Sequence, residues 1–544
     1  MTDPATTQAT FCATLVDEWA RAGVHLAFVA PGSRSTPLAL ALAEDDRIDV
    51  QVHHDERCAA FLALGAGRAT GRPAVALCTS GTAATHFHAA VVEAHHAGVP
   101  LLVCTADRPP ELRDVGAPQA IDQTHLYGRS VRWFFDPGPA DEAMRSSWRS
   151  IGARAVVAAH DGPVHLNLPF REPLAAAPGE LPPGRAGGEP WHRLEPASAS
   201  EVVPIAGRRP VLVAGSRVPP ELTSGSWPLL AGLGATGAGP SVVAHADALL
   251  RVAELREELA PDAVIRIGTP PASRVVNEWL AASGAREATL GRGWVDPGRT
   301  ASLVGGLLQP EVLVAPEGGW LDRWLALDAA ADDAIAAVLA DHPEPTEPGT
   351  ARTVVAALPD GAQLVVSSSM PVRDLEWYAC PRSGITVHAN RGANGIDGVL
   401  STAIGVALAS GAPTACLLGD VAFLHDSNAL IGIADRGIDL TVVVVDNDGS
   451  GIFSFLPQAA TLPAERFECL FGTPHGVRPE LLAAAHGLVS LTVEAADSLA
   501  LAVEASVRAG GARLVVARTD RAANVKLHDE LHAAVRRAVL QVTG

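Results

Sequence analysis

Short, almost continuous runs of Val, Leu and Ile recur along the chain, and each run ends close to Gly, Ser, Thr or Asp. Examples are AVALC at 74–78, LLVC at 101–104 and VVVV at 442–445. A run without polar alternation predicts a strand buried on both faces, as in parallel sheets covered by helices. Longer helical patterns, such as 83–97, separate the runs. We therefore predict an α/β fold built from doubly wound parallel sheets.

Two stretches rich in Pro and Gly interrupt this pattern, at 172–190 and 341–350. Such stretches are typical of linkers between domains. The 544 residues suit several domains, since one domain usually takes about 100–200 residues. We predict three doubly wound parallel-sheet domains: an N-terminal domain at 1–175, a central domain at 190–342 and a C-terminal domain at 350–544.

The formal net charge is −19, and no long run of Lys or Arg is present. This balance argues against a nucleic acid or an anionic membrane surface as the main partner. Lys526 is the only lysine among the 41 basic residues. An anion-binding site in this chain must therefore be built from Arg, whose planar guanidinium binds carboxylates and phosphates in a bidentate way.

The first residues lack the basic and apolar regions of a signal peptide, and no stretch of 18 apolar residues occurs. We therefore expect no membrane insertion and a cytoplasmic location. The cysteines form no CxxC pair and are odd in number, which favours free thiols, most of them buried. They are Cys12, Cys58, Cys78, Cys104, Cys380, Cys416 and Cys469.

Polar residues follow two predicted strands of the C-terminal segment, at Gly419-Asp420 and at 446–449. The carboxyl ends of parallel strands meet at one edge of a sheet, where side-chain oxygens of Asp420 and Asn447 and a backbone carbonyl near Gly449 would hold a hard divalent ion. Helix N-termini at that edge would favour a diphosphate. The same residues also suit two ordinary strand-to-helix turns capped by Asp and Asn.

This pattern resembles the metal–diphosphate motif of thiamine diphosphate enzymes, written GDG followed by NN. Val421 replaces the last Gly of that motif, and Asp446 replaces its first Asn. The resemblance implies thiamine diphosphate as cofactor and Mg²⁺, or Mn²⁺, as the metal. It also implies that Asp420, Asn447 and Gly449 are the metal ligands.

A second part of the resemblance lies in VHHDERCAA, where Glu56 follows a short predicted strand and precedes a helix. Thiamine diphosphate enzymes carry at this place the Glu that activates the cofactor through its pyrimidine ring. The resemblance therefore implies Glu56 as the catalytic residue. A solvated acid at a helix N-terminus is the alternative for a lone Glu.

Three further blocks are GSRSTPL at 32–38, TADRPPEL at 105–112 and NRGANGIDG at 390–398. Together they resemble the 2-succinyl-5-enolpyruvyl-6-hydroxy-3-cyclohexene-1-carboxylate (SEPHCHC) synthase family of menaquinone biosynthesis. The similarity is close in both outer segments and loose in the middle one. It implies a transferase that decarboxylates 2-oxoglutarate and adds the succinyl carbanion equivalent to isochorismate, with release of CO₂.

The resemblance also implies the remaining site residues. The cofactor-binding residues are Ser369, Met370, Ile396, Gly419, Asp420, Ile452 and Phe453. The substrate-binding residues are Ser33, Arg34, Arg108, Gln119, Arg274, Arg373 and Arg391. Arg274 lies in the loosely similar segment, and Pro118 stands where the family commonly has Asn.

Two other functions compete with this one. The chain would alternatively be another thiamine diphosphate-dependent 2-oxo acid decarboxylase or carboligase, or a non-catalytic protein that senses metabolites. A G-x-G-x-x-G pattern at Gly232, Gly234 and Gly237 is followed too soon by Asp247 for a dinucleotide site.

The superfamily places its cofactor between domains of two subunits. The resemblance therefore implies a homodimer at least, with a tetramer possible.

Overall fold

The structure is a computed structural model that describes residues 3–194, 207–215, 223–233, 239–291, 295–305 and 315–543. The described residues form two compact units. Unit 1 comprises Met1–Pro196, Asn390–Gly411 and His425–Ile438. Unit 2 comprises Ala197–Ala389, Ala412–Leu424 and Asp439–Gly544. Two segments from the C-terminal third of the chain therefore belong to the N-terminal unit.

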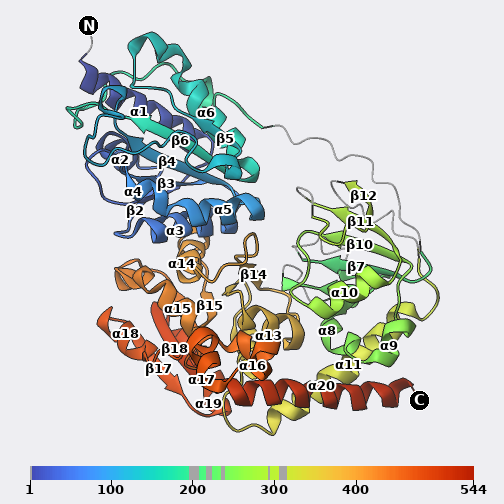
Figure 1. Ribbon diagram of the computed structural model, residues 1–544. Coiled ribbons are helices and arrows are strands. Elements are labelled where there is room, and N and C mark those ends of the chain that lie inside the picture. The colour runs from blue at the N-terminus through green and yellow to red at the C-terminus, as the bar shows by residue number, and fades with distance from the viewer. Residues whose placement is uncertain are drawn as a thin grey trace. The chain divides into compact units, whose positions relative to one another are not determined.

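Three six-stranded sheets occur within the described ranges, and every strand pairing found in them is parallel. Helices accompany each sheet, as Figure 1 shows. This arrangement confirms the predicted fold class of three doubly wound parallel sheets. One sheet lies in unit 1 and two lie in unit 2.

The unit 1 sheet has the strand order β2-β1-β3-β4-β6-β5. Its strands are β1 (Leu26–Val29), β2 (Asp49–Val52), β3 (Ala74–Cys78), β4 (Leu101–Asp107), β5 (Trp133–Phe135) and β6 (Pro163–Pro169). One face is covered by α1 (Pro4–Arg21), α2 (Thr36–Ala43) and α6 (Trp148–Ala158). The other is covered by α3 (Glu56–Thr70), α4 (Thr82–His86) and α5 (His88–Ala97).

The helix predicted over 83–97 is interrupted, which corrects that expectation. The Phe87 N–H bonds to the carbonyl of Ala84, three residues back, at 3.3 Å. The tighter turn separates α4 from α5 at this residue, whose side chain is fully buried.

Unit 1 also contains α14 (Val399–Ser410), which packs closely along α3. Glycines make this approach possible: a Cβ at Gly65 would lie 2.1 Å from the Thr402 carbonyl oxygen, and one at Gly405 would lie 2.0 Å from the Leu62 carbonyl oxygen. The two helix backbones are therefore in direct contact near the middle of α3.

In the central sheet of unit 2 the strand order is β12-β11-β10-β7-β8-β9. The strands are β7 (Pro210–Ala214), β8 (Leu229–Ala231), β9 (Val242–Val243), β10 (Ala263–Ile267), β11 (Arg286–Leu290) and β12 (Ala301–Gly305). Its helices are α8 (Ala246–Leu250), α9 (Ala253–Glu258), α10 (Arg274–Ala282) and α11 (Trp320–Ala340). Of the G-x-G-x-x-G pattern, Gly234 and Gly237 lie outside the described residues. Asp247 is buried and bound to Ser273 and Arg251.

The C-terminal sheet of unit 2 has the order β14-β13-β15-β16-β18-β17. Its strands are β13 (Gln363–Val366), β14 (Thr386–Ala389), β15 (Thr414–Gly419), β16 (Leu440–Asp446), β17 (Val489–Val493) and β18 (Ala512–Arg518). Its helices are α12 (Glu347–Ala357), α13 (Met370–Tyr378), α15 (Asp420–His425), α16 (Pro457–Thr461), α17 (Ala464–Phe467), α18 (Pro479–Ala485), α19 (Ala496–Ala509) and α20 (Arg521–Thr543). A shared apolar core joins both sheets of unit 2, since Leu531 and Val535 of α20 pack with Trp324 and Leu327 of α11.

The runs of Val, Leu and Ile correspond to the central strands, as predicted, because those strands are buried on both faces. β5, β12 and β17 at the sheet edges lack such runs, and alternate residues of β12 and most of β17 are exposed. A strand with one solvated face carries a weaker apolar signal. Within the described residues no helix is both long and apolar enough to span a membrane.

We expect Gly65→Ala to destabilise the protein by about 3 kcal/mol, because the added methyl group overlaps the Thr402 carbonyl. Without that clash Ala would be favoured in a helix by roughly 1 kcal/mol. Chemical unfolding measures the change, with Gly318→Ala as control, since a Cβ there meets nothing within 4 Å. Unchanged or greater stability of Gly65→Ala would contradict the close packing of α3 and α14.

Candidate active site

The carboxyl ends of β13, β15 and β16 lie side by side in the C-terminal sheet of unit 2. The strand order reverses between β13 and β15, because β14 lies on one side of β13 and β15 on the other. Ligands of doubly wound sheets bind at such a reversal. Three predicted site residues lie here: Asp420 and Asn447 directly follow β15 and β16, and Ser369 lies three residues after β13.

Asp420 organises this edge through its carboxylate, which is 2% exposed. Its Oδ1 accepts from the backbone N–H of Val421 at 2.7 Å. Its Oδ2 accepts from the N–H groups of Asn447 at 3.2 Å and Gly449 at 2.9 Å. Burial raises the pKa of Asp420 to about 6, although these N–H groups favour the charged form. A cation placed here would favour the charged form further.

Asn447 is held by a residue that the sequence did not suggest. Its Nδ2 donates to Glu347 Oε1 at 2.8 Å, while its Oδ1 is buried without a hydrogen-bond partner. Burial, with the nearby Asp374 and Asp420 carboxylates, raises the pKa of Glu347 to about 8. Since a buried oxygen without a partner is costly, Asn447 Oδ1 suits a metal ion as its missing partner.

Gly449 completes the loop after β16. Its φ of 143° and the 2.1 Å that would separate an added Cβ from the Gly472 carbonyl oxygen both require glycine. At Gly419, by contrast, a Cβ would meet nothing within 4 Å, so the sheet edge is open there. The buried carboxylate, the unpartnered amide oxygen and this tight loop fit a hard divalent ion with a bound diphosphate.

His475 and Asp446 also lie at this edge, although the sequence signalled neither as a ligand. His475 Nε2 lies 3.2 Å from Asp420 Oδ2, and a ligand atom from each of Asp420, Asp446 and His475 lies within 4.8 Å of the others. Asp448 Oδ1 fixes the His475 segment by accepting from its backbone N–H at 3.0 Å. His475 is 55 residues from Asp420, so no local spacing signals the contact.

The predicted cofactor residues of α13 and of the 3₁₀ helix Gly451–Phe455 flank the same edge. Ser369 has a φ of 75°, unusual for a residue other than glycine, and its carbonyl accepts from Arg373. Met370 is buried. Ile452 and Phe453 follow the Gly449 loop and are half-buried. Burial lowers the pKa of Arg373.

In unit 1, Glu56 is the first residue of α3. Asp55 caps this helix by accepting from the N–H groups of Arg57 at 2.9 Å and Cys58 at 3.3 Å. Asn428 in turn donates to Asp55 at 2.8 Å. Glu56 is half-buried at a helix N-terminus, where a carboxylate is favoured by the helix dipole.

Four predicted substrate residues lie after strands of the unit 1 sheet. Arg34 is buried and donates to the Phe170 carbonyl at 3.0 Å and to Glu172 at 3.2 Å, while its Nε is buried without a partner. Burial and then the positive charge of Arg34 lower the pKa of Arg108, so these two guanidinium groups are neighbours.

Ser33 is exposed beside Arg34, and Arg108 Nε donates to the Pro118 carbonyl at 3.1 Å. Gln119 has a φ of 55°, and its carbonyl accepts from Ser80 Oγ at 2.9 Å. The Pro118 segment, where the sequence departs from the family, is thus tied by its backbone to the end of β4.

The NRGANGIDG segment, which holds Arg391 and Ile396, also belongs to unit 1. Glu93 of α5 accepts from the N–H groups of Gly392 at 2.9 Å and Ala393 at 2.7 Å. Ile396 is half-buried, and a cavity of about 320 Å³ lies beside Gly395 and Asp397.

Arg274 is not brought to any of these sheet edges by a described contact. Its side chain is 88% exposed and pairs with Glu278 on its own helix. The backbone before it is bound to α13, since the N–H groups of Ala272 and Ser273 donate to Glu376. Its role stays a prediction.

Two family models match this chain. Residues 10–126 match the family described as "Thiamine pyrophosphate enzyme, N-terminal TPP binding domain", and residues 367–517 match the corresponding "C-terminal TPP binding domain". The first match contains Glu56 and the second contains Asp420 and Asn447. The chain is therefore a thiamine diphosphate enzyme.

Relatives of known name show which family of thiamine diphosphate enzymes the chain belongs to. The chain is 42% identical to a 2-succinyl-5-enolpyruvyl-6-hydroxy-3-cyclohexene-1-carboxylate synthase of Saccharopolyspora erythraea, over 99% of this chain and 100% of that one. It is 43% identical to the synthase of the same name from Thermobifida fusca, over 96% and 98% of the two chains. The match in Myxococcus xanthus is 40% identical over 98% of each. The chain belongs to the SEPHCHC synthase family.

We expect Glu347→Ala to weaken metal-dependent binding of thiamine diphosphate by about 10- to 100-fold, because it frees the amide of Asn447 to turn. Glu347→Gln retains an acceptor oxygen at the same place and should bind more nearly like the parent. Calorimetric titration with the cofactor at fixed metal concentration measures both. Equal affinity of the Ala variant and the parent would show that Glu347 does not orient Asn447.

Proposed function

We propose that this protein catalyses the SEPHCHC synthase reaction of menaquinone biosynthesis. The substrates are 2-oxoglutarate and isochorismate, and the products are SEPHCHC and CO₂. The observation that carries the proposal is the identity of about 40% over nearly the whole chain with relatives that bear this name. The buried oxygen site around Asp420 supports it, because a decarboxylating carboligase of this class needs its cofactor anchored by a metal.

Asp420, the Asn447 side-chain oxygen and the Gly449 carbonyl would hold the metal, for which Mg²⁺ is the first choice and Mn²⁺ the second. Oxygen ligands of this kind suit Mg²⁺, which usually takes few protein groups and completes its shell with phosphate and water. Ser369, Met370, Gly419, Ile452 and Phe453 would line the cofactor, and Ile396 would support its ring system. When bound, thiamine diphosphate supplies the electron sink that permits loss of CO₂ from a 2-oxo acid.

Glu56 would hold a proton at the pyrimidine ring of the cofactor. Its position as first residue of α3 supports this role, because the helix is capped by Asp55 and its middle packs closely against α14. A rigid carboxylate transfers a proton more effectively than a mobile one, since the donor and acceptor need no rearrangement.

Arginine side chains would bind the carboxylates of both substrates. Arg34 and Arg108 are neighbouring cations with Glu172 close to both, so a substrate carboxylate would bind beside this anion or displace it from Arg34. Arg373 and Arg391 would add further cations, and Ser33 and Gln119 would add polar contacts. Guanidinium groups stay charged when partly buried, which suits sites for dicarboxylates. Arg274 would bind substrate only if its guanidinium broke the ion pair with Glu278.

The assembly is proposed to be a homodimer or a tetramer in the cytoplasm, with domains at 1–175, 190–342 and 350–544. The support is the family pattern, in which Glu56-type and Asp420-type residues of one site come from two subunits. Sedimentation of the active, cofactor-loaded enzyme should give at least twice the mass of one chain. An active monomer would contradict the proposal.

We expect Glu56→Gln to lower the rate of product and CO₂ formation by about 100- to 10,000-fold, the usual contribution of a proton-transferring group. Affinity for thiamine diphosphate should change little, because Glu56 belongs to unit 1 whereas the predicted metal ligands belong to unit 2. Glu44→Gln, a change at an exposed residue of unit 1, is the control. Unchanged turnover of Glu56→Gln would contradict the assignment.

A further inference from the structure

A second cluster of metal-ligating side chains lies in unit 2, away from the Asp420 edge in the sequence. His245 precedes α8, Asp332 lies in α11, and Cys380 follows α13. Asp332 Oδ1 is 3.2 Å from His245 Nε2 and 3.2 Å from Cys380 Sγ. A ligand atom from each of the three residues lies within 4.8 Å of the others. Residues so far apart along the chain gave no spacing signal.

The His245 ring is oriented as a metal ligand would be. Its side chain is 0% exposed, and its Nδ1 lies 3.0 Å from the Trp377 carbonyl oxygen. That carbonyl can only accept, so Nδ1 carries a proton and Nε2 faces Asp332 and Cys380. Metal-bound histidines commonly donate their other ring N–H to a carbonyl in this way.

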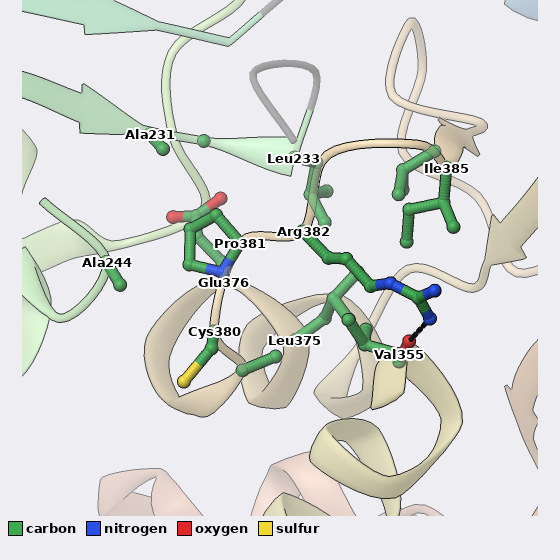
Figure 2. A pocket seen from close by; sticks show the side chains of 13 residues that line it. Ala231, Leu233, Ala244, Val355, Leu375, Glu376, Cys380, Pro381, Arg382 and Ile385 are labelled. Atoms are coloured by element: carbon green, nitrogen blue, oxygen red, sulfur yellow. Dashed lines mark hydrogen bonds between the residues drawn. The ribbon is translucent and has the colours of Figure 1, made fainter. Parts of the chain in front are cut away.

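Asp332 is itself held from outside the cluster. Arg352 donates to its Oδ1 at 2.8 Å and also to the Tyr378 carbonyl at 2.6 Å. Asp332 Oδ1 thus contacts His245, Cys380 and Arg352, and a bound ion would replace the first two contacts while Arg352 keeps the carboxylate in place. Cys380 is exposed and its thiol donates to Asp332, so one side of the cluster is open to solvent. In Figure 2 the Cys380 sulfur points away from Arg382 and Ile385.

The cluster can have the same net charge with and without a bound divalent ion. Burial lowers the pKa of His245, but the Asp332 and Cys380 side chains and the Asp328 carboxylate outweigh it and raise that pKa to about 10. Without a bound ion, both ring nitrogens of His245 face acceptor oxygens, so the cluster holds the cations His245 and Arg352 beside the Asp332 carboxylate. A divalent ion that displaces one proton from His245 and one from Cys380 leaves the same net charge.

We propose that His245, Asp332 and Cys380 form a binding site for a divalent transition-metal ion of the zinc type, with water as the fourth ligand. Tetrahedral bonds of about 2.0–2.3 Å to N, O and S place neighbouring ligand atoms about 3.3–3.6 Å apart. Asp332 Oδ1 lies 3.2 Å from both His245 Nε2 and Cys380 Sγ, which is close to that spacing. Nitrogen and sulfur ligands select such an ion over Mg²⁺. On binding, the ion replaces the two protons, which go to solvent.

The site would join three elements of unit 2. The start of α8 and the middle of α11 accompany the central sheet, and the loop after α13 accompanies the C-terminal sheet. An ion that binds only the folded arrangement stabilises it. The proposed role is therefore structural, and it does not depend on the reaction proposed above.

The test is a Co²⁺ titration of the full-length enzyme, loaded with Mg²⁺ and thiamine diphosphate and kept reduced with a phosphine. We expect one thiolate-to-cobalt charge-transfer signal per chain, release of about two protons per ion near neutral pH, and a higher melting temperature with Zn²⁺. The Asp420 edge holds no cysteine among its clustered ligands in the described chain, so cobalt bound there gives no such signal.

Cys380→Ser should abolish the charge-transfer signal, and Asp332→Asn should weaken ion binding by at least about tenfold. Cys469→Ser is the matched control, since Cys469 is the other exposed cysteine of the described chain, and it should retain the signal. Absence of a charge-transfer signal in the parent overturns the proposal. So does a signal that persists in Cys380→Ser or disappears in Cys469→Ser.

Discussion

One buried carboxylate holds the cofactor edge of unit 2 together. Asp420 accepts from the backbone N–H groups of Val421, Asn447 and Gly449, so it joins the end of β15 to the loop after β16. Such hydrogen bonds to a charged acceptor are about twice as strong as neutral ones. They fix the Gly449 loop, so a metal ion would meet a site that is already formed. His475, from a distant segment, contacts the same carboxylate.

The corresponding constraint in unit 1 is steric. Gly65 and Gly405 let α3 and α14 approach until their backbones touch, and the Glu93 carboxylate binds the backbone of the segment that precedes α14. Rigid helix packing of this kind transmits position along the whole helix. Glu56, at the first position of α3, is therefore placed by this packing together with the adjacent Asp55 cap and its Asn428 contact.

The predictive power of the sequence differed between strands and side-chain partners. Central strands such as β3 and β16 were predictable because burial on both faces demands continuous apolar residues. Edge strands such as β17, and the break at Phe87, depend on local exposure and one hydrogen bond, which periodicity does not encode. Asp420 and Asn447 were found from their spacing and their resemblance to a known motif. Glu347 and His475 were not found, because each reaches the site from far along the chain.

The sequence by itself determined the fold class and the family, because the apolar runs of buried strands and the family motifs are both short segments of contiguous residues. Only the tertiary structure decided which groups surround those motifs. Glu347 lies 100 residues before Asn447, and His245, Asp332 and Cys380 span 135 residues between the first and the last. Hydrogen bonds and metal sites need atoms within about 2–3.5 Å of one another. Across such separations along the chain, only the packing of helices and sheets brings them that close.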